Sequence, residues 1–171
     1  MAKMTSAYAN KLLKQLGEDK EFWTNKEGSS CLYTAAVGET PVVPEYNYSE
    51  VAATIAEIDR KICIIKHAIN LANATSQVET STGAMTVDTI LVAMAQKNKR
   101  KAFLDYLRKQ QPKMRKETQV YNARNAAPEY QYINYDLDQI KQEYEKITAE
   151  IMDMQLALDK YNQTFEFDVE L

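Results

Sequence analysis

The chain has 171 residues and a formal net charge of −3, a length that fits one folded domain with a hydrophobic core of its own. Apolar residues make up 45% of it and charged residues 26%, the balance of a soluble folded protein, and no apolar run approaches the roughly 18 residues that a membrane span needs. A single histidine excludes zinc and di-iron motifs that use two or more, and four widely separated glycines exclude the glycine-rich loops that bind nucleotide phosphates.

The N-terminal segment predicts a first helix over about residues 5–23, where Tyr8, Leu12 and Leu16 recur at helical spacing. The segment lacks the apolar run and the small-residue cleavage site of a signal peptide, so we expect a cytoplasmic protein. Residues 28–44 contain glycines and prolines that interrupt regular structure. This stretch predicts a loop.

A second helix is predicted to begin near residue 48. Asn47, with Glu50 three positions later, has the pattern of a capping box, in which the asparagine oxygen accepts a hydrogen bond from a first-turn amide. The apolar residues of this helix step by four and three, so they form a narrow stripe, here called a seam, that has to lie against another helix. The seam residues are Val51, Ile55, Ile58, Ile62, Ile65 and Ile69.

A connecting turn is expected over residues 76–85, and a third helix from Thr86, as N-cap, to about Gln110 ahead of Pro112. The apolar residues before and after its polar middle lie on faces well over a quarter-turn apart. Either the helix kinks there or its two halves pack on different neighbours. The two groups are Val87, Ile90, Leu91 and Met94, and then Phe103, Leu104 and Leu107.

The closing segment repeats the heptad pattern and then changes to the pattern of a strand. The second seam consists of Leu137, Ile140, Tyr144, Ile147, Ile151, Met154, Leu158 and Tyr161. From Phe165 to Leu171 every second residue is apolar, with acidic residues between, which is the period of a half-buried strand. Residues 129–135 also alternate and are the best candidate partner for this strand.

These elements predict a mainly all-α fold in a single domain over residues 1–171. We expect an elongated antiparallel helical bundle or coiled-coil hairpin of about four helices, with a minor β element formed by about residues 129–135 and 164–171. The strands can pair within one chain or between two chains of a homodimer. A strand at a chain terminus suits exchange between subunits, because the partner then satisfies its edge amides.

Charge is distributed unevenly along the chain. Residues 97–116 hold nine basic residues and one acid, whereas residues 134–171 hold ten acids and three bases. One interpretation is that the basic third helix lies along the acidic fourth, within or between subunits. The other is that the basic stretch captures phosphate groups or nucleic acid. The candidate anion-binding residues are Lys97, Lys99, Arg100, Lys101, Arg108, Lys109, Lys113, Arg115 and Lys116.

The two seams, the segment INLANATSQVE and the ending LDKYNQTFEFDVEL together resemble a family of small, functionally uncharacterised bacterial helical proteins described as septicolysin-like. The resemblance covers most of the chain, except residues 23–46, where no pattern matches. The family has no established activity to transfer. Its name evokes a cytolysin, but the chain has neither a secretion signal nor an amphipathic β-hairpin suited to a barrel wall.

The conspicuous single residues favour structural roles. His67 lies off the seam and is interpreted as a surface or boundary residue rather than a general base. Cys63 is expected to be a buried packing residue, and with Cys31 it suits a reducing compartment. The three acids of the terminal strand lack the glycine-turned loop of a calcium site, so a solvated strand face is expected.

The sequence therefore predicts a non-enzymatic structural or interaction module that self-associates through its seams and terminal strand, with no cofactor or metal, since no nucleophile, base and oxyanion donor can be assembled. One alternative is a polyanion or nucleic-acid binder using residues 97–116. A third, less favoured, is a membrane-active septicolysin-like protein. The candidate self-association residues are Tyr144, Ile147, Ile151, Met154, Leu158, Phe165, Phe167 and Val169.

Overall fold

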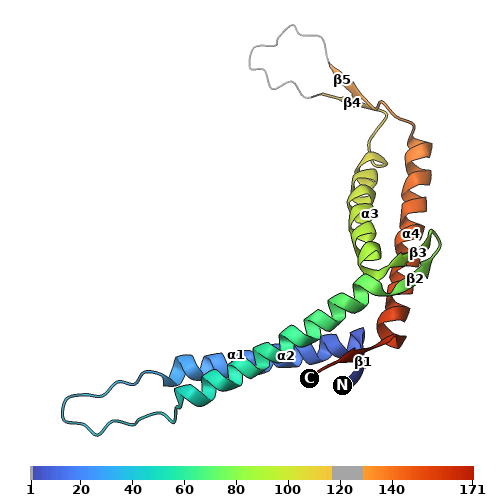
Figure 1. Cartoon of the computed structure of the whole chain (residues 1–171). Helices are drawn as coiled ribbons and strands as arrows, with labels where there is room; N and C mark the ends of the chain where they lie inside the picture. The colour runs from blue at the N-terminus through green and yellow to red at the C-terminus, as the bar shows by residue number, and fades with distance from the viewer. Residues whose placement is uncertain (1, 117–128) are drawn as a thin grey trace, which may run out of the picture. The chain divides into compact units, whose positions relative to one another are not determined.

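A computed structural model of the chain describes residues 2–116 and 129–171 (Figure 1). Within these residues the protein is mainly helical, with small antiparallel strand pairs, so the predicted fold class is confirmed. The helices are α1 (Ser6–Ser30), α2 (Tyr48–Thr75), α3 (Val87–Leu107) and α4 (Leu137–Thr164). The strands are β1 (Ala2–Thr5), β2 (Gln77–Thr80), β3 (Gly83–Thr86), β4 (Lys113–Arg115), β5 (Tyr130–Tyr132) and β6 (Glu166–Val169).

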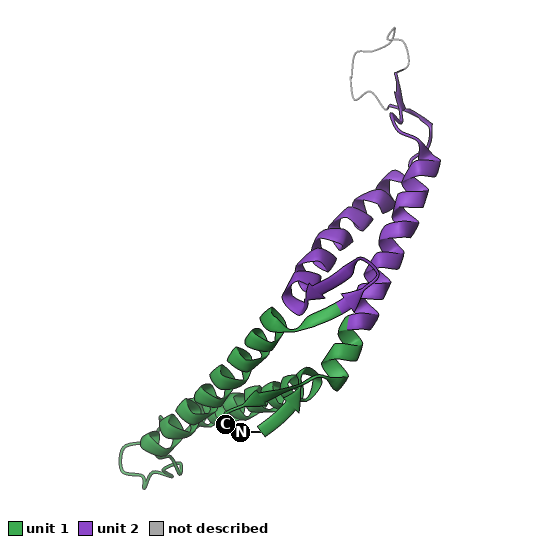
Figure 2. Ribbon diagram, turned by 45° about the vertical axis from the view of Figure 1, so that its right-hand side comes forward, with its two compact units in different colours: residues 1–78, 158–171 green, residues 79–157 purple. Residues whose placement is uncertain are grey.

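The chain divides into two compact units (Figure 2). Unit 1 comprises residues 1–78 and 158–171, and therefore holds α1, α2, β1, the end of α4 and β6. Unit 2 comprises residues 79–157 and holds α3, most of α4 and the short ladder of β4 and β5. The strand β2 begins in unit 1 and ends in unit 2.

Unit 1 is organised around a hairpin of two helices, α1 and α2, that lie side by side and run in opposite directions (Figure 1). The predicted cap of α2 is confirmed: the Asn47 side chain accepts hydrogen bonds from the backbone amides of Ser49 at 3.1 Å and Glu50 at 3.4 Å. Thr5 caps α1 in the same way, accepting from the amide of Tyr8. Both helices therefore start at residues whose side chains replace the missing intrahelical acceptors.

The seam of α2 is confirmed by burial. Val51, Ile58, Ile65 and Ala72 are buried, and they stand seven positions apart. The intervening seam residues Ile55, Ile62 and Ile69 are half-buried. A seven-residue period keeps one stripe of a helix facing its partner, which is why the residues of this stripe are the most deeply buried of α2.

The core of unit 1 joins both chain termini to the helix hairpin. Met4 of β1, Ala9 of α1, Ile65 of α2 and Val169 of β6 form one buried cluster. Phe167 packs against this cluster with a half-buried ring. The strand pair thus covers the hairpin with the residues that alternate toward it, while the other side chains of each strand face solvent.

The predicted partner of the terminal strand is wrong. The alternation from Phe165 onward does form a strand, but β6 pairs antiparallel with β1, with Ala2 opposite Val169 and Thr5 opposite Glu166. It does not pair with residues 129–135. The pairing lies within one chain, and the buried side chains of β1 and β6 explain it, because the ladder gains a hydrophobic face by lying on the helix hairpin.

The first helix is longer than predicted, since α1 continues past Trp23 to Ser30 and the expected loop begins at Cys31. Gly28 lies inside α1 and has a helical backbone conformation, so it does not terminate the helix. One tertiary contact holds the added part: Glu27 accepts a hydrogen bond from the Tyr46 hydroxyl at 3.1 Å, while Lys20, earlier on α1, pairs with Asp59 of α2 at 2.6 Å. Such contacts offset part of the roughly 1 kcal/mol that a helical glycine costs.

In unit 2, α3 is one uninterrupted helix, and its buried and half-buried residues recur at heptad spacing through the polar middle, where a kink or a change of neighbour is predicted. Val87, Ile90 and Leu104 are buried. Met94, Lys97 and Lys101 fill the heptad positions between them and are half-buried, whereas Leu91 and Phe103 are exposed. Lysine can occupy such positions because its aliphatic stem packs while its ammonium group reaches a partner at the edge.

The remaining strands form two short antiparallel pairs; the strand predicted within residues 129–135 is confirmed, but neither pairing was predicted. Residues 76–85, expected to be a plain turn, form paired strands β2 and β3, with Gly83 at a positive φ of 114° that favours glycine. The amide of Ser81 at this turn donates to Asp153 of α4 at 2.7 Å. Residues 129–135 contain β5, which pairs with β4, so that Lys113 stands opposite Tyr132.

Replacing Ile65 by alanine should lower the free energy of unfolding by about 2–5 kcal/mol, because its side chain is 0% exposed and the deletion leaves a cavity. Leu71→Ala, on the same helix but 56% exposed, should cost less than about 1 kcal/mol. Denaturant unfolding followed by circular dichroism measures both changes. Equal losses would contradict the placement of Ile65 at the centre of the core.

Candidate functional site

Part of the basic stretch is paired with α4 inside unit 2. Lys97 Nζ lies 2.6 Å from a carboxylate oxygen of Glu150, and the Arg100 guanidinium lies 3.2 Å from Glu143. The pairs run in opposite order along the two helices, as an antiparallel hairpin requires. The interpretation that the basic third helix lies along the acidic fourth is therefore confirmed, and it holds within one chain.

A second group of cations gathers at the end of α3. Asp105 accepts hydrogen bonds from Lys109 and Arg108, and these two partners, in that order, lower the pKa of its carboxyl group. The Arg108 guanidinium carbon also lies 4.2 Å from the centre of the Tyr144 ring on α4. Because Arg108 and Lys109 are paired with Asp105, and Arg108 also lies over Tyr144, the end of α3 has fewer unpaired cations than its sequence suggests.

The other basic residues divide into paired and open ones. Lys101 lies over the Tyr144 ring at 5.6 Å, and Lys113 lies over the ring of Tyr130 at 4.2 Å. Lys116 pairs with Glu129 at 3.2 Å in an exposed position. Among the described residues, this leaves Lys99 and Arg115 of the nine candidates without a polar or aromatic partner. The candidate anion-binding residues therefore do not stand together as one unpaired basic surface.

The candidate self-association residues mostly face inward. The seam of α4 is covered within the chain, so its side chains are not displayed to a second copy. Phe165 is the most exposed of the eight, with 41% of its surface accessible. The buried members are Met154, Leu158 and Val169, and the half-buried members are Tyr144, Ile147, Ile151 and Phe167.

A different apolar surface, which the sequence reasoning missed, lies on α3 opposite its seam. Val92, Lys99 and Tyr106 recur every seven residues there, and Phe103 stands one turn before Tyr106. We call these four residues the outer stripe. Val92, Phe103 and Tyr106 are 63%, 52% and 57% exposed. Val92, Lys99 and Tyr106 have heptad spacing in the sequence, but because Lys99 is charged the three do not form a recognisable apolar pattern.

The aromatic residues of the outer stripe are arranged as one patch. The rings of Phe103 and Tyr106 stack with their centres 6.2 Å apart. The Arg100 guanidinium carbon lies 6.0 Å from the centre of the Phe103 ring. The patch therefore combines large apolar surface with an arginine at its edge, whose guanidinium also pairs with Glu143, and both aromatic residues and arginine are enriched at protein interfaces.

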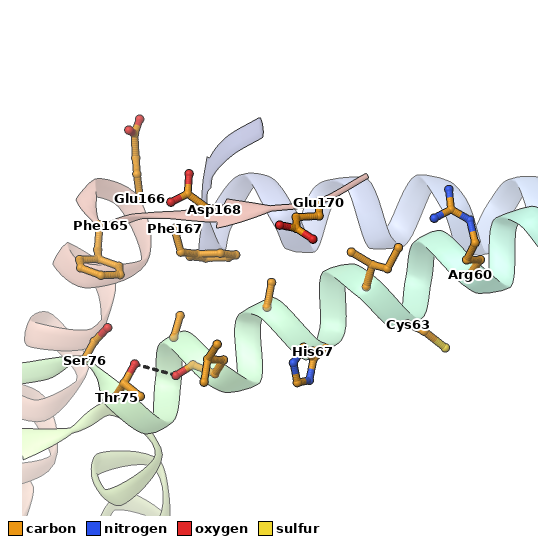
Figure 3. Close-up of a pocket in the computed structure, with 14 residues that line it drawn as sticks. Arg60, Cys63, His67, Thr75, Ser76, Phe165, Glu166, Phe167, Asp168 and Glu170 are labelled. Atoms are coloured by element: carbon orange, nitrogen blue, oxygen red, sulfur yellow. Dashed lines mark hydrogen bonds between the residues drawn. The ribbon is translucent and has the colours of Figure 1, made fainter. Parts of the chain in front are cut away.

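A groove of about 1000 Å³ lies in unit 1 between α2 and β6 (Figure 3). Its α2 wall includes Ile64, Ala68 and Leu71, and its other wall includes Phe165 and Phe167, whose rings point toward α2. The strand also contributes carboxylates, with Glu166 and Asp168 standing on the side of the strand that faces away from α2. The groove is thus apolar inside and acidic along the strand.

His67 and Cys63 also border this groove. Both are exposed, so the prediction that Cys63 is a buried packing residue is wrong, while the surface position of His67 is confirmed. Their side chains point away from β6 (Figure 3). Across the described ranges, 2–116 and 129–171, no three histidine, cysteine or acidic side chains are grouped as a metal site. None of the helices in those ranges has the length and apolarity needed to cross a membrane.

Comparisons with known proteins identify a shared fold. No protein-family model and no curated protein matches the sequence. Among solved structures, the chain is similar to a functionally unknown conserved protein from Corynebacterium diphtheriae, with a TM-score of 0.60 over 98% of this chain and 100% of that chain. At 15% sequence identity this similarity concerns the fold alone. The septicolysin-like resemblance stays a prediction.

Lys97→Met should destabilise unit 2 by about 1–3 kcal/mol, because it leaves the shielded Glu150 carboxylate without its partner. The double variant Lys97→Met/Glu150→Leu should recover most of that loss, since it removes the orphaned charge and keeps the apolar volume. Denaturant unfolding measures both.

Lys116→Met is the matched control, because its pair with Glu129 is more than half exposed on both sides and should contribute less than about 1 kcal/mol. If Lys97→Met lost no more stability than Lys116→Met, the pair of Lys97 with Glu150 would not stabilise the seam, contrary to this prediction.

Proposed function

We propose that the chain is a non-enzymatic structural or interaction module that self-associates, and that the outer stripe of α3 is its contact face. The observation that carries the proposal is the exposure of Val92, Phe103 and Tyr106 on the face of α3 opposite a seam that is already covered. A helix with apolar residues on two opposite faces needs a separate neighbour to bury each face. Within the chain α3 has α4 on one face, so a second copy supplies the other.

The composition of the outer stripe supports this choice. Aromatic residues and arginine are enriched at protein interfaces, where large rings displace water and the guanidinium group satisfies polar partners at the rim. Phe103, Tyr106 and Arg100 bring this combination together on two adjacent turns.

The contact face differs from the one expected from the sequence. The seams and Val169 are covered within the chain, and β6 already has β1 as partner. Exchange of the terminal strand is therefore not needed for the strand to be satisfied, and the outer stripe becomes the stronger candidate. A cytoplasmic setting accords with this proposal and with the free state of Cys31 and Cys63.

The polyanion-binding alternative has less support. Ion pairs hold five of the nine candidate cations, at Lys97, Arg100, Arg108, Lys109 and Lys116, and aromatic rings accompany two more. Within residues 2–116 and 129–171, Lys99 has no partner but belongs to the outer stripe, so its exposure is explained equally well by a protein interface and by an anion-binding site. The membrane-active alternative has no observation in its favour among the described residues.

Light scattering on a size-exclusion column tests the proposal. The wild-type chain should have a mass at least twice the 19.6 kDa of one chain, and Tyr106→Glu should lower it toward 19.6 kDa, because the new carboxylate would be buried in the contact. Tyr8→Glu is the matched control: Tyr8 is 58% exposed, close to the 57% of Tyr106, but lies on α1.

The control variant should keep the wild-type mass, and circular dichroism should show both variants folded. A wild-type mass of 19.6 kDa at every concentration would overturn self-association. Loss of assembly in both variants alike would instead move the contact away from the outer stripe. Added single-stranded DNA should leave the elution volume unchanged, and a salt-sensitive shift would favour the polyanion alternative.

A further inference from the structure

The terminal strand has one open edge. In the described part of the chain, β6 is hydrogen-bonded to β1 in a two-stranded ladder and to no other strand. Half of the backbone N–H and C=O groups of an edge strand point away from its partner, and a second extended segment can pair with them. This edge belongs to unit 1 and is separate from the outer stripe on α3.

The groove of about 1000 Å³ adjoins this strand on the side of α2. Its apolar lining is not fully used by the chain itself, since Leu71 and Phe165 retain substantial exposed surface. A groove between a strand edge and a helix suits recognition of an extended peptide, in which main-chain hydrogen bonds give affinity and alternate side chains enter the groove. A helix laid in the same place would leave the edge amides of β6 unpaired.

The strand also carries an excess of negative charge, because three acidic residues lie on it or directly after it and the one cation opposite it in the ladder is Lys3 of β1, which faces Asp168. Glu166, Asp168 and Glu170 line the groove, and among the described residues none of them forms an ion pair. Arg60, the arginine at the groove, is held by Glu57 through two hydrogen bonds of 2.8 and 2.9 Å. An incoming segment therefore meets a strand whose solvent face attracts cations.

We propose that the groove between α2 and β6 binds an extended segment of a partner protein, as a third strand on β6, and that apolar and basic residues alternate along this segment. Side chains of a strand point alternately to its two faces. Those on the inner face would lie beside Phe165 and Phe167 over α2. Those on the outer face would lie beside Glu166 and Asp168, where opposite charges across neighbouring strands stabilise the pairing.

The opposite edge of the ladder is a poorer candidate. The cavity beside β1 measures about 440 Å³, and its charged residues are Lys3 and Glu166, which offset each other. The β6 edge has more than twice that volume and acidic residues at alternate positions. The proposal is independent of self-association, because the groove is built from unit 1 and the outer stripe from unit 2.

Fluorescence anisotropy with a labelled synthetic peptide of alternating valine and lysine tests the proposal on the full chain. Binding should be saturable and should weaken as salt rises, because the carboxylates are solvent-exposed. Two control peptides should bind at least about tenfold more weakly: alternating valine and glutamate, and a block peptide of the same composition as the probe. A probe methylated at every backbone amide should also lose binding, because neither of its edges keeps an N–H group to donate to β6.

Two matched variants locate the site. Leu71→Lys puts a cation into the groove and should weaken binding at least about tenfold, whereas Phe22→Lys, an equally apolar-to-basic change at an exposed position of α1 outside the groove, should leave it unchanged. Tyr106→Glu should bind the probe like wild type, which separates this site from the self-association face.

Equal binding of the block peptide or of the methylated probe would overturn the proposal, since attraction of charge alone would then explain the signal. Wild-type affinity in a folded Leu71→Lys variant would also overturn it. The methylated probe requires no change in the protein, so it decides the question even if Leu71→Lys fails to fold.

Discussion

The pairing of β1 with β6 is the interaction on which the account of unit 1 depends. It joins the first residues of the chain to the last, and a two-stranded ladder of this size is not stable alone. Met4 and Val169 stabilise it by packing on Ala9 and Ile65 of the helix hairpin. The same pairing leaves the other edge of β6 open beside α2. The core of unit 1, the pairing of its first and last strands and the groove beside α2 therefore all follow from one strand pair.

Both units show how little surface a two-helix hairpin covers. A seam of heptad residues on each helix faces its partner, and the remaining faces stay open unless another element covers them. In unit 2 this leaves the outer stripe of α3, where Phe103 and Tyr106 stack in the open. In unit 1 the strand pair covers part of the hairpin and leaves the groove. These two exposed apolar surfaces, which differ in chemistry, are the observations behind the proposed role as an interaction module.

The sequence predicted features that depend on neighbours along the chain. The seam of α2, its Asn47 cap and the alternation after Phe165 are local patterns, and the structure contains them. The sequence did not predict the pairings between distant segments. The strand β1 is too short to show alternation, and no local pattern around it identifies β6 as its partner. The seam of α3 was hidden because Lys97 and Lys101 occupy apolar positions, and only their partners on α4 explain them.

The structure pairs the two terminal strands, β1 and β6, within one chain. Lys3 and Asp168 are opposite each other in the ladder and both exposed, so cysteines at these positions should be close enough to oxidise. We would measure the mass of the oxidised Lys3→Cys/Asp168→Cys chain on a non-reducing denaturing gel, with Cys31 and Cys63 replaced by serine. Pairing of β1 with β6 within one chain should give a cross-linked monomer. A covalent dimer would show that the strand is exchanged between subunits and would contradict it.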